Sequence, residues 1–218
     1  MTATLTYRDK IAVLDLGAGE NRFSPGLLIE INAHLDAAVA DGAHALVTTA
    51  AGKFYSNGLD LEWLAAHSER AEWYVAQVQS LLARLLTFPL PTAAALPGHA
   101  FGAGAMLALA HDFRVMRADR GYFCFPEADI RIPFTKGMAA LIQAKLTPRS
   151  AVAAMTTGHR FPAPEALTHE LIDATADADA VLDTAVARLL PLGAKDPGTL
   201  AAIKTVMFAD AAAALTLA

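Results

Sequence analysis

Short apolar runs at the beginning of the chain predict strands. The runs at residues 11–16, 45–49 and 92–96 are each followed by glycine or polar residues, which is typical of buried strands that end in a turn. Two later segments, residues 113–116 and 122–125, flank a polar turn and are also expected to be extended. Residues 5–7 alternate loosely and open the pattern.

Helices are expected between these strands. Ser24 is placed to cap a helix whose apolar positions recur at helical spacing until Gly42. A long amphipathic segment covers residues 68–86, and the segment 101–110 becomes helical as its glycines run out. Strands that alternate with helices favour an α/β fold with parallel pairing.

The pattern changes after Pro133, where it is helical almost to the end of the chain with several interrupting prolines. We therefore expect an α/β core over residues 1–150 and a C-terminal helical region over residues 151–218.

Composition adds a reason to expect subunit contacts. The chain has 218 residues, of which 55% are hydrophobic and 18% charged, and this excludes a disordered, collagen-like or disulfide-stapled protein. One large domain with an ample core is the expectation at this length. So little charge also indicates exposed apolar area of the kind found at interfaces between subunits.

Charge and terminal segments indicate the partners and the compartment. The formal net charge of −5 gives no electrostatic case for nucleic acid or for a membrane surface. No signal-peptide pattern opens the chain, and the lone Cys124 fits a reducing compartment, so we expect a cytoplasmic protein. Residues 85–111 carry no Asp, Glu, Lys or Arg, but three prolines divide this stretch, which is expected to be core.

Two glycine-containing segments follow predicted strands at their carboxyl ends, where α/β sheets build their sites. They are residues 52–61 and 98–106, and both turns can present free backbone N–H groups. Two such donors converging on one point would form an oxyanion hole. The alternative is that these glycines only turn the chain. Neither segment fits a dinucleotide fingerprint, a P-loop or a serine-hydrolase elbow.

Glu127 is the candidate acid. It stands among apolar residues in the segment 123–133, and desolvation raises the pKa of a carboxyl group toward the range that suits proton transfer near neutrality. Such a group can serve as a general base at carbon. Alternatively, Glu127 pairs with Arg131 or caps a helix.

Together with His111-Asp112 and residues 116–121, these segments resemble the signature regions of the crotonase, or enoyl-CoA hydratase/isomerase, superfamily. The resemblance covers Tyr7 to about Lys204, and it is closest to the plant-type 3-enoyl-CoA to 2-enoyl-CoA isomerases. It implies a ClpP/crotonase-like β-β-α superhelical core with a C-terminal helical trimerisation region, and hence a homotrimer or a dimer of trimers.

The resemblance also implies roles for individual residues. Asn57 N–H and Ala103 N–H would hold the thioester oxygen of an acyl-CoA, and Glu127 would move the proton. Hydratases of the family carry a second glutamate at the position of Met106, which cannot ionise. A single acid suits a 1,3-proton shift better than the addition of water.

Substrate contacts are implied for the loops around these residues. Arg22 and Lys53 are the basic residues placed to meet the CoA phosphates, with a solvated surface charge as the alternative for each, and Asp60 is also expected to cap the next helix. The full expected set of substrate-binding positions is Arg22, Lys53, Ser56, Gly58, Leu59, Asp60, Leu61, Gly102, Gly104 and Met106.

The resulting hypothesis is isomerisation of a 3-enoyl-CoA to the conjugated 2-enoyl-CoA, in which the CoA thioester is the substrate and no metal or redox cofactor is required. Hydration or thioester cleavage would keep the same scaffold, and a non-catalytic role in acyl-CoA binding or assembly belongs to a different class. The final residues, 215–218, do not form a peroxisomal address of the Ser-Lys-Leu type.

Overall fold

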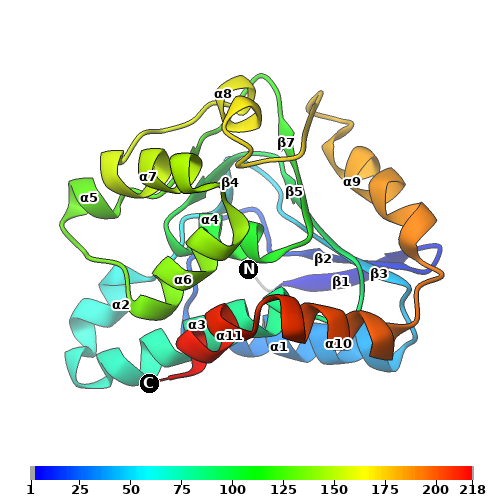
Figure 1. The fold of residues 1–218 in the computed structure, drawn as a ribbon, viewed down its shortest axis with the longest axis horizontal. Coiled ribbons are helices and arrows are strands. Elements are labelled where there is room, and N and C mark those ends of the chain that lie inside the picture. Colours follow the sequence, from blue (N-terminus) through cyan, green and yellow to red (C-terminus); the bar gives the residue numbers. More distant parts are fainter. Residues whose placement is uncertain (1–2, 218) are drawn as a thin grey trace.

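The main sheet of the molecule has six strands. The computed structural model describes residues 3–217; Met1, Thr2 and Ala218, which belong to the terminal segments considered above, lie outside the described residues. Every neighbouring pair in this sheet is parallel except the first, an antiparallel hairpin (Figure 1). In spatial order the strands are β1 (Thr4–Arg8), β2 (Ile11–Asp15), β3 (Ala45–Thr49), β5 (Thr92–Leu96), β7 (Phe113–Arg117) and β9 (Ala174–Ala176).

A second sheet of three short parallel strands carries the functional loops. Its strands are β4 (Phe54–Ser56), β6 (His99–Phe101) and β8 (Phe123–Cys124), in that order. Each follows a strand of the main sheet along the chain, so β3 leads to β4, β5 to β6 and β7 to β8, and helices come next. This repeated strand-strand-helix order is the expected crotonase-like superhelix. Strands of two or three residues are too short to show alternation, so the hydrophobic pattern predicts neither β4 nor β6.

The helices begin and end close to the predicted positions where a cap is present. Ser24 Oγ accepts a hydrogen bond from Leu27 N at 3.2 Å at the start of the first helix, as predicted. The first helices are α1 (Pro25–Ala40), α2 (Leu61–Ala66), the short 3₁₀ turn η1 (Ser68–Arg70), α3 (Ala71–Leu86) and α4 (Ala103–Ala110). The later ones are α5 (Glu127–Ile130), α6 (Lys136–Lys145), α7 (Pro148–Thr157), α8 (Ala163–Thr168), α9 (Val181–Leu189), η2 (Leu190–Leu192), α10 (Pro197–Met207) and α11 (Ala209–Thr216).

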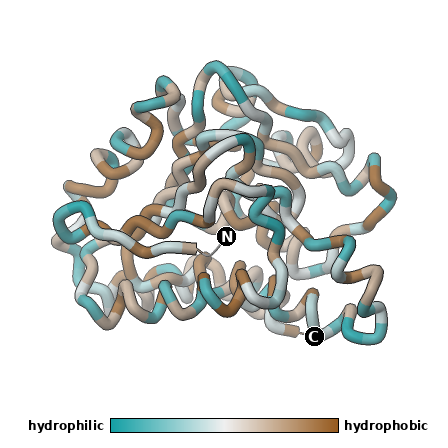
Figure 2. The backbone as a smooth tube through the Cα atoms, turned by 180° about the vertical axis from the view of Figure 1, so that it is seen from behind, coloured by the Kyte–Doolittle hydropathy of each residue, from teal (hydrophilic) through white to brown (hydrophobic). Residues whose placement is uncertain are grey.

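The C-terminal elements help to enclose the core. Helix α9 packs on β3, β5 and β7, where its buried residues Val181, Ala185 and Leu189 meet Val47 and Val115 in a separate apolar cluster. Helix α11 lies against α6 and α3, and β9 adds a strand where helix alone was expected. In Figure 2 the outer loops are mostly hydrophilic, whereas the central strands are mostly hydrophobic. The sheet therefore has both faces covered, as parallel sheets require.

Within residues 3–217, no single helix is both long and apolar enough to cross a bilayer. Only α10 and α11, taken together despite a bend of 79° between them, reach the required length and composition.

Candidate active site

The two glycine-containing segments meet at the ends of β4 and β6. Gly58 has a φ of +77°, and a Cβ placed on it would lie 2.8 Å from Ala103 N. A Cβ on Gly104 would lie 2.7 Å from the Cβ of Ser56. Because backbone on both sides blocks a side chain, glycine is required at these positions, and the start of α4 lies directly against the turn after β4.

Backbone hydrogen bonds fix the turn after β4 against the loop after β2. Asn57 N donates to Glu20 O at 2.8 Å, and Phe23 N donates to Gly58 O at 2.8 Å. The amide of Asn57 is thus already engaged. The prediction that this N–H is a free oxyanion donor is wrong, because the carbonyl of Glu20 reaches it from a loop that the motif does not include.

The next amides along the turn differ in their hydrogen bonding. Gly58 N donates to Ser56 Oγ at 3.1 Å, and Ser56 is fully buried. Within residues 3–217, Leu59 N forms no hydrogen bond, and neither does Ala103 N at the first position of α4. The first residues of a helix have no carbonyl partner within that helix. The available pair of donors in this region is therefore Leu59 and Ala103.

These donors line a pocket of about 390 Å³ together with Glu127. The pocket lies between the turn after β4, the start of α4 and the short helix α5. It is lined by Arg22, Asn57, Leu59, Leu61, Glu62, Phe101, Gly102, Ala103, Pro126, Glu127, Ile130 and Ile132.

Glu127 is largely buried at the first position of α5, and burial raises the pKa of its carboxyl group to about 7. Its Oε2 is buried and has no hydrogen-bond partner in the described part of the chain. Arg131 takes the left-handed conformation at the end of α5, with a φ of 60°, and is not among the ion pairs of residues 3–217. Glu127 therefore has the environment of a proton-transfer group, and the Arg131 pairing considered above is absent from this part of the chain.

The two predicted phosphate contacts differ in position. Arg22 lines the pocket, where its guanidinium pairs with Glu20 at 2.6 Å and Glu62 at 2.8 Å. Lys53 is exposed, with its Nζ 5.2 Å from the centre of the Phe54 ring, and it does not line the pocket. The structure thus brings only Arg22 to the cavity wall.

Several other predicted positions lie outside the pocket lining. Asp60 Oδ1 accepts from Trp63 N at 3.1 Å, so its predicted role as the cap of α2 is confirmed. Ser56, Gly104 and Met106 are buried and lie outside the pocket lining, and Met106 is only 1% exposed. Leu61 and Gly102, by contrast, line the pocket.

Several residues that line the active-site pocket were not predicted from the sequence. Phe101, Pro126, Ile130 and Ile132 line the pocket, and Glu62 stands beside Arg22. The apolar spacing of Ile130 and Ile132 directly after the candidate acid was the available signal. These side chains make the surroundings of Glu127 largely apolar.

The two-sheet core, together with a pocket that joins unengaged amides to a buried acid, is characteristic of the crotonase class. Residues 8–218 match the family described as enoyl-CoA hydratase/isomerase, and the chain belongs to that family. Among curated relatives, it is 36% identical over 204 residues to enoyl-CoA delta isomerase 3 of Arabidopsis thaliana, covering 88% of this chain and 85% of that protein.

Two further comparisons agree with this membership. The peroxisomal enoyl-CoA delta isomerase 2 of Arabidopsis thaliana is 36% identical over 183 residues, covering 79% of this chain and 76% of that protein. The solved structure of a probable enoyl-CoA hydratase from Mycobacterium tuberculosis superposes with a TM-score of 0.91 at 27% identity, covering 99% of this chain and 92% of that one. The fold is thus the crotonase fold, and relatives of this family carry both isomerase and hydratase names.

Proposed function

We propose that the protein is an enoyl-CoA delta isomerase, which shifts the double bond of a 3-enoyl-CoA into conjugation with the thioester. The observation that carries this proposal is a single unpaired carboxyl group, that of Glu127, in a pocket that also holds two unengaged amides. Glu62 lines the same pocket, but it is paired with Arg22 at 2.8 Å. The identity to the Arabidopsis isomerases supports the same assignment.

The reaction needs one acid-base group and one oxyanion site. Ionised Glu127 removes a proton from C2 of the 3-enoyl thioester, and the electrons move onto the thioester oxygen. Leu59 N–H and Ala103 N–H stabilise the resulting enolate by hydrogen bonding. Glu127 then returns a proton to C4, which leaves the conjugated 2-enoyl product. A carboxyl pKa of about 7 suits both transfers near neutral pH.

Hydration is the nearest alternative within the family. Adding water requires a group that orients and deprotonates the water while another protonates carbon, and the family hydratases use two glutamates for this. Met106 stands at one of these positions and is buried in the core. Thioester cleavage also remains an outcome of the assay, since it uses the same oxyanion site. Non-catalytic acyl-CoA binding would leave the buried Glu127 without a chemical role.

The substrate's CoA moiety is assigned to the rim of the pocket. We propose that Arg22 meets a CoA phosphate, exchanging part of its pairing with Glu20 and Glu62, since guanidinium binds phosphate in a forked geometry. Lys53, exposed on the neighbouring turn, is the second proposed contact.

The assay that tests the function follows ultraviolet absorbance of the enoyl thioester. The protein is expected to increase this absorbance with 3-hexenoyl-CoA, and Glu127→Gln is expected to abolish the increase while CoA-ester binding persists. Glu62→Gln is the matched control, because it alters the other pocket carboxylate: it should retain kcat and change only KM, since Arg22 loses one partner. Faster consumption of crotonyl-CoA by hydration, or full turnover by Glu127→Gln, would overturn the proposal.

We also propose that the protein forms a homotrimer, or a dimer of trimers, through helices beyond Pro133. Exposed apolar side chains support this, among them Val152 on α7, Leu190 on η2 and Val206 on α10. Sedimentation velocity measures the assembly. A Val206→Asp variant is expected to weaken it, and a monomeric wild-type protein would contradict the proposal.

A further inference from the structure

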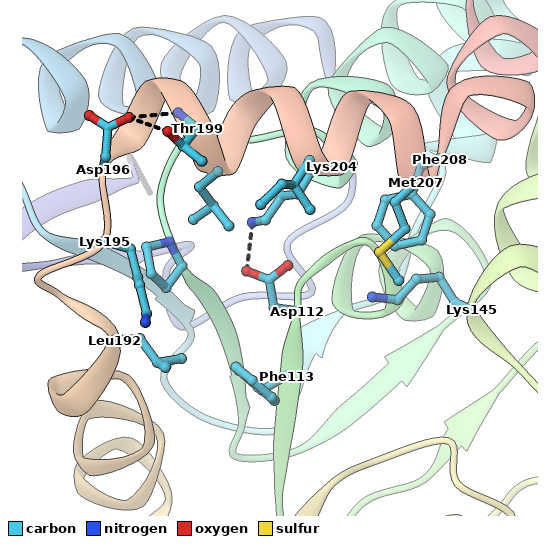
Figure 3. A pocket seen from close by; sticks show the side chains of 13 residues that line it. Asp112, Phe113, Lys145, Leu192, Lys195, Asp196, Thr199, Lys204, Met207 and Phe208 are labelled. Atoms are coloured by element: carbon cyan, nitrogen blue, oxygen red, sulfur yellow. Dashed lines mark hydrogen bonds and ion pairs between the residues drawn. The ribbon is translucent and has the colours of Figure 1, made fainter.

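A second cavity, of about 580 Å³, lies away from the active-site pocket and shares no lining residue with it. Helix α10 forms one wall, and the beginning of β7 and the end of α6 form others (Figure 3). Most of the lining side chains are apolar, namely Pro91, Phe113, Leu192, Leu200, Ile203, Met207 and Phe208. A volume of this size is within the range of small-molecule sites, ~300–1,000 Å³.

One lysine in this cavity has a counter-ion of its own. Lys204 is 4% exposed, and its Nζ donates to Asp112 Oδ2 at 2.6 Å and to Leu90 O at 2.9 Å. Asp112 Oδ2 also accepts from Thr92 N at 2.8 Å. The charge of Lys204 is therefore balanced within the protein.

Lys145 is different. Its Nζ donates to His111 O at 2.8 Å and lies 5.2 Å from the centre of the Phe208 ring, but within residues 3–217 it forms no ion pair. An ammonium group has three donors, so two remain for a ligand. Figure 3 shows the ammonium of Lys145 at the cavity, on the Asp112 side of Met207 and Phe208. Burial lowers the pKa of Lys145 to about 8, because desolvation disfavours the charged ammonium.

The neighbouring charges do not supply the missing anion. Arg114 is buried and pairs with Asp173 at 2.8 Å, and Lys204 occupies Asp112. Asp196, at the other end of the cavity, caps α10 by accepting from Thr199 N at 2.8 Å. The inner cations are Lys145, Lys204 and Arg114, and the inner anions are Asp112 and Asp173, so one positive charge is in excess. Buried charges normally have a counter-ion.

We propose that this cavity binds an amphiphilic monoanion, an alkyl chain that ends in a carboxylate. The carboxylate would accept hydrogen bonds from the free donors of Lys145, and the chain would lie along Ile203 and Met207 on α10. Lys195, which also lines the cavity and forms no ion pair within residues 3–217, is exposed to solvent, whereas Lys145 is partly buried. A single carboxylate therefore matches the inner cation, and the apolar part of the wall suits an alkyl chain rather than a polyanion. A neutral alkane or alcohol would leave Lys145 without its counter-ion.

Calorimetric titration with decanoate tests the site. The wild-type protein is expected to bind decanoate at least tenfold more tightly than 1-decanol, which has the same chain without the charge. Lys145→Met keeps the length of the side chain and removes its charge, so decanoate affinity should fall at least tenfold while decanol affinity stays within twofold. A second variant, Met207→Asp, alters a residue that is 70% exposed and places a carboxylate beside the cavity. It should weaken decanoate binding without unfolding the protein.

Three results would overturn the proposal. The first is equal decanoate affinity in Lys145→Met and wild type, and the second is displacement of decanoate by a saturating CoA ester in the active-site pocket. The third is that wild type does not bind decanoate while Met207→Asp changes the oligomeric state, which would make this face a contact between copies of the chain. The isomerase assay is an independent readout, because Lys145→Met should turn over 3-hexenoyl-CoA at the wild-type rate.

Discussion

Oε1 of Glu127 lies 3.4 Å from the point where a Cβ on Gly102 would stand. Gly102 also has a φ of +50°, a conformation that side chains rarely adopt. Gly102, which precedes Ala103 at the start of helix α4, thus leaves room for the carboxyl group of the proposed base. The absence of a side chain at position 102 is a requirement of both the turn and the acid.

Gly102→Ala is therefore expected to harm both stability and catalysis. The backbone strain should lower the free energy of unfolding by about 1–3 kcal/mol, and the added methyl group should push on the Glu127 carboxyl and reduce kcat. Denaturant unfolding and the 3-hexenoyl-CoA assay measure the two effects. Gly26→Ala is the control, since Gly26 lies in α1 with no close neighbour and should change neither by much. Wild-type kcat in Gly102→Ala would show that the contact is unimportant.

The activity should depend on pH through Glu127. Its pKa is about 7, and only the ionised carboxylate can remove the C2 proton, so kcat/KM is expected to rise from pH 6 to pH 8 with a midpoint near that value. Measured initial rates across this range, with a substrate that does not itself ionise there, give the profile. A midpoint near 4.5, the ordinary value for glutamate, would contradict a desolvated base.

The same raised pKa predicts that removing the acid stabilises the fold. In the unfolded chain Glu127 ionises near 4.5, and in the folded protein near 7, so the unfolded state binds fewer protons between these values and stability falls as pH rises through this window. Glu127→Gln should thus be more stable than wild type at pH 8, by about 1–3 kcal/mol, since one pKa unit corresponds to ~1.4 kcal/mol. The difference should disappear below pH 4.5. Thermal unfolding at pH 4 and pH 8 tests this, and a destabilised variant at pH 8 would refute it.

The choice of oxyanion donors is testable by replacing single amides with esters. An ester at Leu59 or Ala103 removes one N–H and keeps the side chain, and kcat should fall ~10²–10³-fold at each position. The same exchange at Asn57 removes a hydrogen bond to Glu20 O, so it should lower stability and leave kcat within tenfold. Should the Asn57 ester show the larger loss of kcat, the sequence-based assignment would be restored.

The buried pair between Lys204 and Asp112 should be far more sensitive than an exposed pair. Lys204→Met leaves Asp112 largely buried without its cation, and the expected loss is ~3–5 kcal/mol of unfolding free energy. Arg117→Met breaks the exposed pair with Asp119 and should cost less than ~1 kcal/mol. Denaturant unfolding of both variants provides the comparison, and equal losses would show that burial does not set the difference.

The main sheet could be predicted from the sequence more completely than the second one. Strands β3 and β5 coincide with the apolar runs 45–49 and 92–96, because a buried parallel strand has apolar residues on both faces. Strands β4, β6 and β9 have two or three pairing positions each, and their existence depends on neighbours distant in the chain. Such pairing leaves no local periodicity.

The site shows the same division. Glu127 and Ala103 could be predicted, because an acid among apolar residues and a glycine-flanked helix start are local features. That Leu59 rather than Asn57 has the free amide could not be predicted, because it depends on where the Glu20 carbonyl lies. The unpaired charge of Lys145 was equally hidden, since it depends on how α6, α10 and the start of β7 come together.

Strand β9 and helix α9 also bear on how the chain folds during synthesis. The edge of β7 and the apolar face formed by Val47 and Val115 are complete only when Ala174–Ala176 and Val181–Leu189 have arrived. A nascent chain that ends before these residues presents an unpaired parallel edge and an uncovered sheet face, both of which favour aggregation. Because β9 and α9 are synthesised late, the period before they emerge from the ribosome is when this protein should depend most on chaperones.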